Sequence, residues 1–206
     1  MEEKVQHIIE KVSALYLSYG IRSVTMDDVA RELGVSKKTL YECVVDKNDL
    51  VEKFLDFHAK RLGAALLCIY NGKVNAIDAL LEISRIINHF LKDINPSITF
   101  DLQKYHPEIW QKLMKYKSIH VFDNVMTNLR QGIKEGLYRS DLKPEVIAKI
   151  YVSRVELSME PGLTDALNYS STEIFNELIN YHIRGIASKK GIEYLDKKIA
   201  TQQKKH

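Results

Sequence analysis

Two short helical patterns separated by a tight turn occupy residues 25–50, TMDDVARELGVSKKTLYECVVDKNDL. Thr25 can cap the first helix, and Asp28, three residues later, would complete a capping box. Gly34 follows the last apolar position of that helix, where a left-handed residue commonly ends a helix. Ser36 can then cap a second helix. The stretch therefore predicts a helix-turn-helix.

The rest of the chain also favours helices. Apolar residues recur at steps of three and four, and 206 residues include only nine Gly and four Pro. We predict an all-α protein in which an N-terminal three-helix head with the helix-turn-helix, residues 1–47, precedes a larger helical body, residues 48–206. Further helices are expected over 5–19, 48–70, 77–91, 107–133, 144–157 and 170–186, with the one before Pro161-Gly162 ending there. A short segment, 97–105, precedes Pro107.

The net charge of +3 says little about a nucleic-acid partner. Its excess lies at the end of the chain, where residues 184–206 carry seven basic and two acidic side chains. Nucleic-acid binding depends on the face presented, and Lys37, Lys38 and Lys47 gather around the second helix of the helix-turn-helix. The basic tail is interpreted as a solvated terminal helix, with a DNA-binding arm as the alternative.

The sequence lacks motifs for a disulfide, a membrane span, a metal site or a catalytic site. Cys43 and Cys68 have no CxxC pairing, the first residues contain no apolar leader core, and the longest uncharged apolar run, Leu62–Tyr70, is too short to span a bilayer. We expect a cytoplasmic protein that does not enter a membrane. No two of the seven His are three or four residues apart, and no nucleophile or phosphate-binding motif appears. The sequence thus predicts no metal site, no cofactor and no catalytic residues, so an enzyme is not expected.

Several of these residues together resemble the tetracycline-repressor (TetR) family of bacterial transcription regulators. The resemblance covers roughly the first quarter of the chain and rests on LYLSYG in the first helix, Thr25, Val29-Ala30, Leu33-Gly34-Val35-Ser36, Thr39-Leu40-Tyr41, Lys47 and Asp49-Leu50. It implies that Thr25, Tyr41 and Lys47 contact phosphates, while Ser36, Lys37, Lys38 and Thr39 lie in or beside the major groove. Helix N-termini, a phenol hydroxyl and ammonium groups suit those roles.

The sequence departs from the family pattern just after Tyr41. Cys43 stands where many members carry His or Tyr, and Val44 replaces a frequent Phe but should still fill a core position. Glu42 would repel phosphates unless it accepts a hydrogen bond from a cytosine amino group or pairs with Lys38. The operator sequence is therefore not predictable.

The resemblance also implies a small-molecule effector in the body. Polar groups on core-facing helix stripes must find a partner or line a wet cavity, although an ion pair would explain a residue such as Arg154 equally well. The candidate ligand-binding residues are His58, Arg61, Asn88, Phe90, Phe100, Trp110, Met114, Lys117, Asn124, Tyr151 and Arg154.

A palindromic DNA site requires a two-fold protein, so a homodimer is expected. The resemblance suggests that the helices around Ile147 and Ile174 pair with their symmetry mates, with an intramolecular face as the alternative. The predicted interface residues are Ile147, Ile150, Phe175, Leu178, His182 and Gly185.

The sequence thus predicts a ligand-responsive homodimeric regulator, most simply a repressor, that binds a palindromic double-stranded DNA operator. One alternative is a helical ligand-binding or scaffold protein whose helix-turn-helix contacts another protein. The other is an all-α enzyme that uses a cavity in the body.

Overall fold

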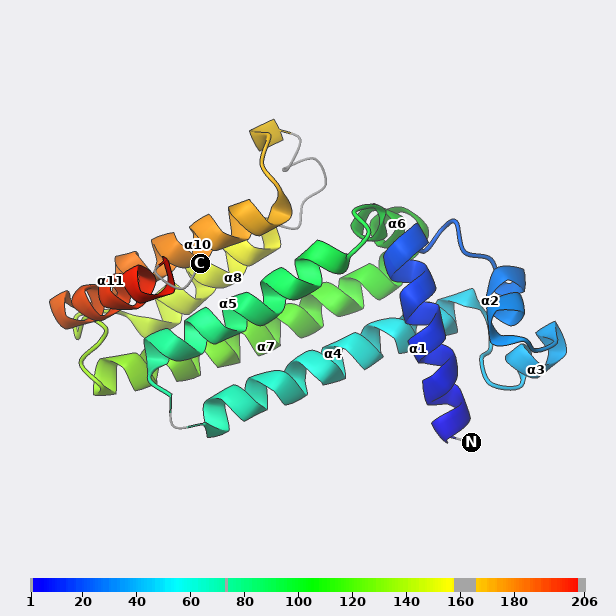
Figure 1. Cartoon of the computed structure of the whole chain (residues 1–206), viewed down its shortest axis with the longest axis horizontal. Coiled ribbons are helices and arrows are strands. Elements are labelled where there is room, and N and C mark those ends of the chain that lie inside the picture. Colours follow the sequence, from blue (N-terminus) through cyan, green and yellow to red (C-terminus); the bar gives the residue numbers. More distant parts are fainter. Residues whose placement is uncertain (1, 73, 158–165, 204–206) are drawn as a thin grey trace. The chain divides into compact units, whose positions relative to one another are not determined.

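The computed structural model describes residues 2–72, 74–157 and 166–203. Over these ranges it contains ten named helices and no strand, which confirms the all-α prediction (Figure 1). The helices are α1 Glu2–Tyr19, α2 Met26–Leu33, α3 Lys37–Tyr41, α4 Lys47–Asn71, α5 Ala76–Asp93, α6 Ser97–Tyr105, α7 Pro107–Lys134, α8 Pro144–Leu157, α10 Ser171–Ile186 and α11 Lys189–Gln203. Within the same ranges, no helix is long and apolar enough to cross a membrane.

The chain divides into two compact units. Unit 1 comprises Met1–Ala65 and Lys92–Lys115, and unit 2 comprises Leu66–Leu91 and Tyr116–His206. The proposed functional boundary after residue 47 is a separate matter and stays a prediction.

Helix α1 buries one face and ends where Gly20 takes a positive φ of 81°. Val12 and Tyr16 are fully buried on that face, as the periodicity predicts. Tyr19 continues the same spacing three residues after Tyr16, but 65% of its side chain is exposed. Periodicity identifies the direction of a helix face, but it does not show how far along the helix the covering elements extend.

The core of unit 1 joins α1, α2 and α3 to three later helices. Phe54 of α4 meets the Tyr16 ring edge to face, with 5.3 Å between ring centroids. Ile98 of α6 and Ile109 of α7 belong to the same cluster of buried side chains, although they lie far along the chain. The core around α1, α2 and α3 is thus completed by side chains of α4, α6 and α7.

Helix α4 begins at Lys47, one residue earlier than expected, because Asp46 can cap it. The Asp46 carboxylate accepts a hydrogen bond from the backbone N–H of Asp49 at 2.9 Å, and the Asp49 carboxylate accepts one from the N–H of Val45 at 2.8 Å. These bonds satisfy backbone donors that the first helical turn leaves without partners.

The core of unit 2 contains a satisfied polar group at its centre. The Tyr138 hydroxyl donates to Asn128 Oδ1 at 2.9 Å, and Asn128 Nδ2 donates to the backbone oxygen of Ala76 at 2.8 Å. The Tyr138 ring lies directly against Gly132 of α7, where a Cβ atom would come within 2.1 Å of it. Glycine is therefore required there for close packing.

The later helices agree with their predicted starts. Ser170 and Glu173 form the expected capping box before α10, with the Ser170 backbone N–H donating to Glu173 at 2.9 Å. Pro144 occupies the first turn of α8. The predicted end of that helix at Pro161-Gly162 lies outside the described residues.

Candidate nucleic-acid interface

The first helix of the helix-turn-helix is fixed at both ends as the sequence predicts. The Thr25 hydroxyl accepts from the backbone N–H of Asp28 at 3.2 Å, and the Asp28 carboxylate accepts from the backbone N–H of Thr25 at 2.9 Å. The hydrogen bond from the Thr25 side chain and the one from its backbone hold the pKa of Asp28 below its usual value. Gly34 ends α2 in the left-handed region with φ of 65°.

The second helix, α3, is a single short turn held by one cap and one anchor. Ser36 Oγ accepts from the backbone N–H of Thr39 at 3.1 Å, and Leu40 is completely buried. The two side chains after the cap, Lys37 and Lys38, are exposed, whereas Thr39 is half-buried. Leu40 thus anchors the buried face of the helix, while the side chains of Lys37 and Lys38 at its N-terminus remain accessible.

Lys37 is exposed but forms an ion pair. Its ammonium group pairs with Asp27 of α2 at 2.8 Å, and this hydrogen bond raises the pKa of Lys37. Both side chains are about half exposed, so the pair is a weak one. A phosphate or base could displace Asp27 at little cost.

Tyr41, Glu42 and Val44 divide between solvent and core. Tyr41 is 47% exposed and Glu42 is also exposed, whereas Val44 is 3% exposed and fills the predicted core position. Cys43 is half-buried. A phenol hydroxyl and a carboxylate therefore lie in succession on the accessible end of α3.

Lys47 is held more tightly than the sequence suggests. Its Nζ donates to the backbone oxygen of Arg22 at 3.3 Å, and the side chain is only partly exposed. Burial lowers the pKa of Lys47, while the nearby charges of Asp101 and Asp28 act in the opposite direction. Periodicity could not reveal this bond because it joins positions 25 residues apart.

The predicted ligand-binding residues are divided between the two units. His58, Arg61, Phe100, Trp110 and Met114 belong to unit 1, and Asn88, Phe90, Lys117, Asn124, Tyr151 and Arg154 belong to unit 2. Their common role as one pocket stays a prediction.

In unit 1, most of these side chains take part in ordinary packing. The His58 ring lies against those of Phe54 and Phe57, with centroids 4.8 and 5.4 Å apart, and burial lowers the pKa of His58. Arg61 lies over the Phe57 ring. Trp110 packs against the buried core, Met114 is half-buried and Phe100 is 45% exposed.

In unit 2, the buried polar groups are more informative. Lys117 is half-buried and burial lowers its pKa to about 8, and Tyr151 packs in the core against His182. Asn88 donates to Asn176 at 2.5 Å, and the backbone oxygen of Asn124 accepts from the Tyr70 hydroxyl at 3.2 Å. The other two, Phe90 and Arg154, are exposed.

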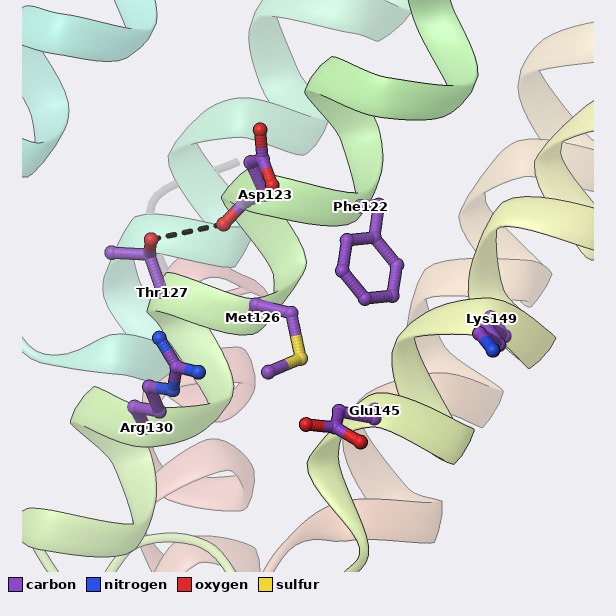
Figure 2. Close-up of a pocket in the computed structure, with 7 residues that line it drawn as sticks. All are labelled: Phe122, Asp123, Met126, Thr127, Arg130, Glu145 and Lys149. Atoms are coloured by element: carbon purple, nitrogen blue, oxygen red, sulfur yellow. Dashed lines mark hydrogen bonds between the residues drawn. The ribbon is translucent and has the colours of Figure 1, made fainter.

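An open groove of about 480 Å³ lies between α7 and α8 in unit 2 (Figure 2). Its lining includes none of the predicted ligand residues, and each helix contributes both acidic and basic groups to it, namely Asp123 and Arg130 from α7 and Glu145 and Lys149 from α8. Phe122 and Met126 provide apolar surface. The groove was not predictable from the sequence, because exposed charges on helices usually indicate a solvated face.

The six predicted interface residues lie on α8 and α10 with very different exposure. Ile150 is 52% exposed and Gly185 is also exposed. Ile147 and Leu178 are half-buried, and Phe175 is buried in the core of unit 2. The His182 ring packs on Tyr151 with 4.5 Å between centroids. Val146 and Tyr181, which the sequence reasoning omitted, are 50% and 76% exposed on the same helices.

Comparison with known proteins agrees with this geometry. Residues 8–54 match the family described as "Bacterial regulatory proteins, tetR family". The "Uncharacterized HTH-type transcriptional regulator YvaF" of Bacillus subtilis is 22% identical over 167 residues, which are 81% of this chain and 87% of that protein.

Solved structures share the fold across nearly the whole chain. A TetR-family transcriptional regulator from Cytophaga hutchinsonii superposes with a TM-score of 0.69 at 19% identity, covering 91% of this chain and 96% of its own. A Saccharomonospora viridis protein in complex with choline has a TM-score of 0.69 at 17% identity, covering 92% and 100%. Residues 8–54 thus match the tetR family of bacterial regulatory proteins, and the chain shares its fold with these solved structures over nearly its whole length.

Proposed function

We propose that this regulator is a homodimeric, ligand-responsive repressor that reads a palindromic operator through the major groove. The observation that carries the proposal is the form of α3. It is anchored by the buried Leu40 and capped by Ser36, while Lys37, Lys38 and Tyr41 are exposed. A rigidly held helix with accessible cationic and hydroxyl groups suits base-edge and phosphate contacts.

The DNA contacts divide into two kinds. Thr25, Tyr41 and Lys47 would hold backbone phosphates. Lys37, Lys38 and Thr39 would face base edges in the groove, with Ser36 beside them. Lys37 would exchange its weak pair with Asp27 for a contact to DNA.

The dimer would use the exposed apolar surface of α8 and α10. The exposed large apolar side chains there are Val146, Ile150 and Leu157 of α8 and Tyr181 of α10, while the exposed Gly185 would allow close approach. Two-fold pairing places the two recognition helices about 34 Å apart, one duplex turn, in the state that binds DNA.

A small molecule in the body would regulate that spacing. Support comes from the choline complex of the Saccharomonospora viridis protein, which shows a ligand bound to this fold. The effector would act only through its different affinity for the DNA-binding and non-binding states. The protein would act in the cytoplasm, where bacterial operators are found, and it would need no catalytic step or cofactor.

The proposal is tested by selecting duplexes from a random-sequence library with the full-length protein, followed by footprinting on the DNA that flanks its own coding region. We expect a protected palindrome and a dimer in solution. Lys38→Glu should abolish protection, while Lys143→Glu, which places the same reversal on an exposed site in unit 2, should preserve it. A protein that forms no specific complex with DNA would instead be a helical scaffold.

A further inference from the structure

A second group of cations lies beside the proposed phosphate contacts, at the junction of the α1–α2 loop and α6. The Arg22 guanidinium lies over the Tyr105 ring, 4.7 Å from its centroid, and the Lys104 ammonium lies 5.6 Å from the same centroid. Lys104 is also 5.2 Å from the Phe100 centroid. We call Arg22, Lys104 and Tyr105 the Tyr105 cluster.

The two cations of the Tyr105 cluster are not neutralised. Both side chains are exposed, and neither forms an ion pair within the described parts of the chain. Asp101 is close, but it is buried and its carboxylate accepts from the backbone N–H of Arg22 at 2.9 Å. Two like charges held over one ring attract anions more strongly than either would alone.

The position of the cluster is continuous with the predicted DNA contacts. Lys47 Nζ donates to the backbone oxygen of Arg22, so the α1–α2 loop touches the start of α4. The chain just after the cluster meets the same helix end, because His106 Nδ1 lies 2.7 Å from Asn48 Oδ1. Arg22 also precedes the phosphate-binding cap Thr25 by only three residues.

We infer that the Tyr105 cluster binds the DNA backbone at phosphates adjacent to those held by Thr25 and Lys47, one for each cation. This rests on the proposed DNA binding and extends it from the helix-turn-helix to α6. The proposed contact is sequence-independent, because phosphate groups carry no sequence information. It would add affinity and salt dependence without adding specificity.

The test uses the full-length protein and the duplex that the wild-type protein selects from a random library. Affinity is measured by fluorescence anisotropy across a salt series. Arg22→Gln and Lys104→Gln should each weaken binding and make the slope of log K against log salt shallower by about 0.9. Arg22→Lys and Lys104→Arg should retain the slope, because they preserve the charge.

The matched control is Lys60→Gln, which removes an exposed cation of the same unit about 20 Å along α4 from Lys47. Its slope should equal that of the wild-type protein. If the cluster only fastens α6 to the loop, the Gln variants will lower the melting temperature and leave the slope unchanged, which overturns the inference. Loss of slope in the charge-preserving variants also overturns it.

Failure of the proposed function looks different. A wild-type protein that selects no duplex removes the proposed function and this inference together. Suppose instead that the wild-type protein selects a duplex and that Lys47→Gln makes the salt slope shallower. If both cluster variants then have the wild-type slope, this inference alone is overturned.

Discussion

Lys47 and Arg22 join the start of α4 to the loop before α2 through a hydrogen bond of 3.3 Å from the ammonium group to the backbone oxygen. One ammonium proton holds the loop, which leaves the others for the proposed phosphate contact. The loop leads directly to Thr25, so a phosphate contact made by Lys47 would also steady one made by Thr25.

Loss of the phosphate contacts should weaken binding to every DNA sequence. Tyr41→Phe removes a hydroxyl donor and Lys47→Ala removes a charge, so both should lower affinity, and Lys47→Ala should reduce the salt slope by roughly one unit. Gel shifts or anisotropy on specific and random duplexes would measure this. Unchanged binding by both variants would remove the phosphate assignments, and Lys143→Ala provides the control.

Glu42 should affect sequence preference or non-specific affinity. Its carboxylate is exposed directly after Tyr41, where it would repel phosphates or accept a hydrogen bond from a cytosine amino group. Glu42→Ala should therefore change the selected sequence or strengthen binding to random DNA, while Glu193→Ala, an exposed acid on α11, should do neither. No change in either quantity would place Glu42 away from the groove.

The cap at Thr25 should contribute to stability as well as to binding. Thr25→Ala removes the acceptor for the Asp28 N–H and should cost about 1 kcal/mol of unfolding free energy. Thr25→Ser keeps a hydroxyl and serves as the control. Urea unfolding compares the two variants, and equal stability would show that the capping box carries no net energy.

His182 should make stability depend on pH. Burial lowers its pKa to about 4, below the usual value of 6.5. Between these two pH values the imidazole is protonated in the unfolded chain and neutral in the folded chain. Stability from this residue is complete above the unfolded pKa and is lost as pH falls from 6.5 towards 4. Wild-type protein should lose about 2 kcal/mol more than His182→Phe between pH 7 and pH 5.

This comparison requires urea unfolding at one protein concentration, because dimer formation would otherwise change apparent stability. Equal losses in the two proteins would show that His182 is solvated in the native state. His89→Phe is the matched control, because His89 is exposed in unit 2.

Local features were predictable because neighbouring residues determine them. The boxes at Thr25 and Ser170, the left-handed Gly34 and the buried Leu40 all follow from spacings of a few residues. The Lys47–Arg22 bond depends on the approach of separate elements, and helix periodicity carries no information about that approach. The fold class was therefore predictable, whereas the contacts that constrain the candidate site were not.

The core of unit 1 is built from two separate segments of the chain. Ile98, Leu102 and Ile109 fill it from beyond residue 92, and Asp101 holds the loop before α2. A single cut after α4 would leave these positions empty and expose the apolar surface of α1 and α4 to water. A chimaera that exchanges DNA specificity with a relative must therefore transfer both pieces, or choose exchanges on the surface of α3 alone.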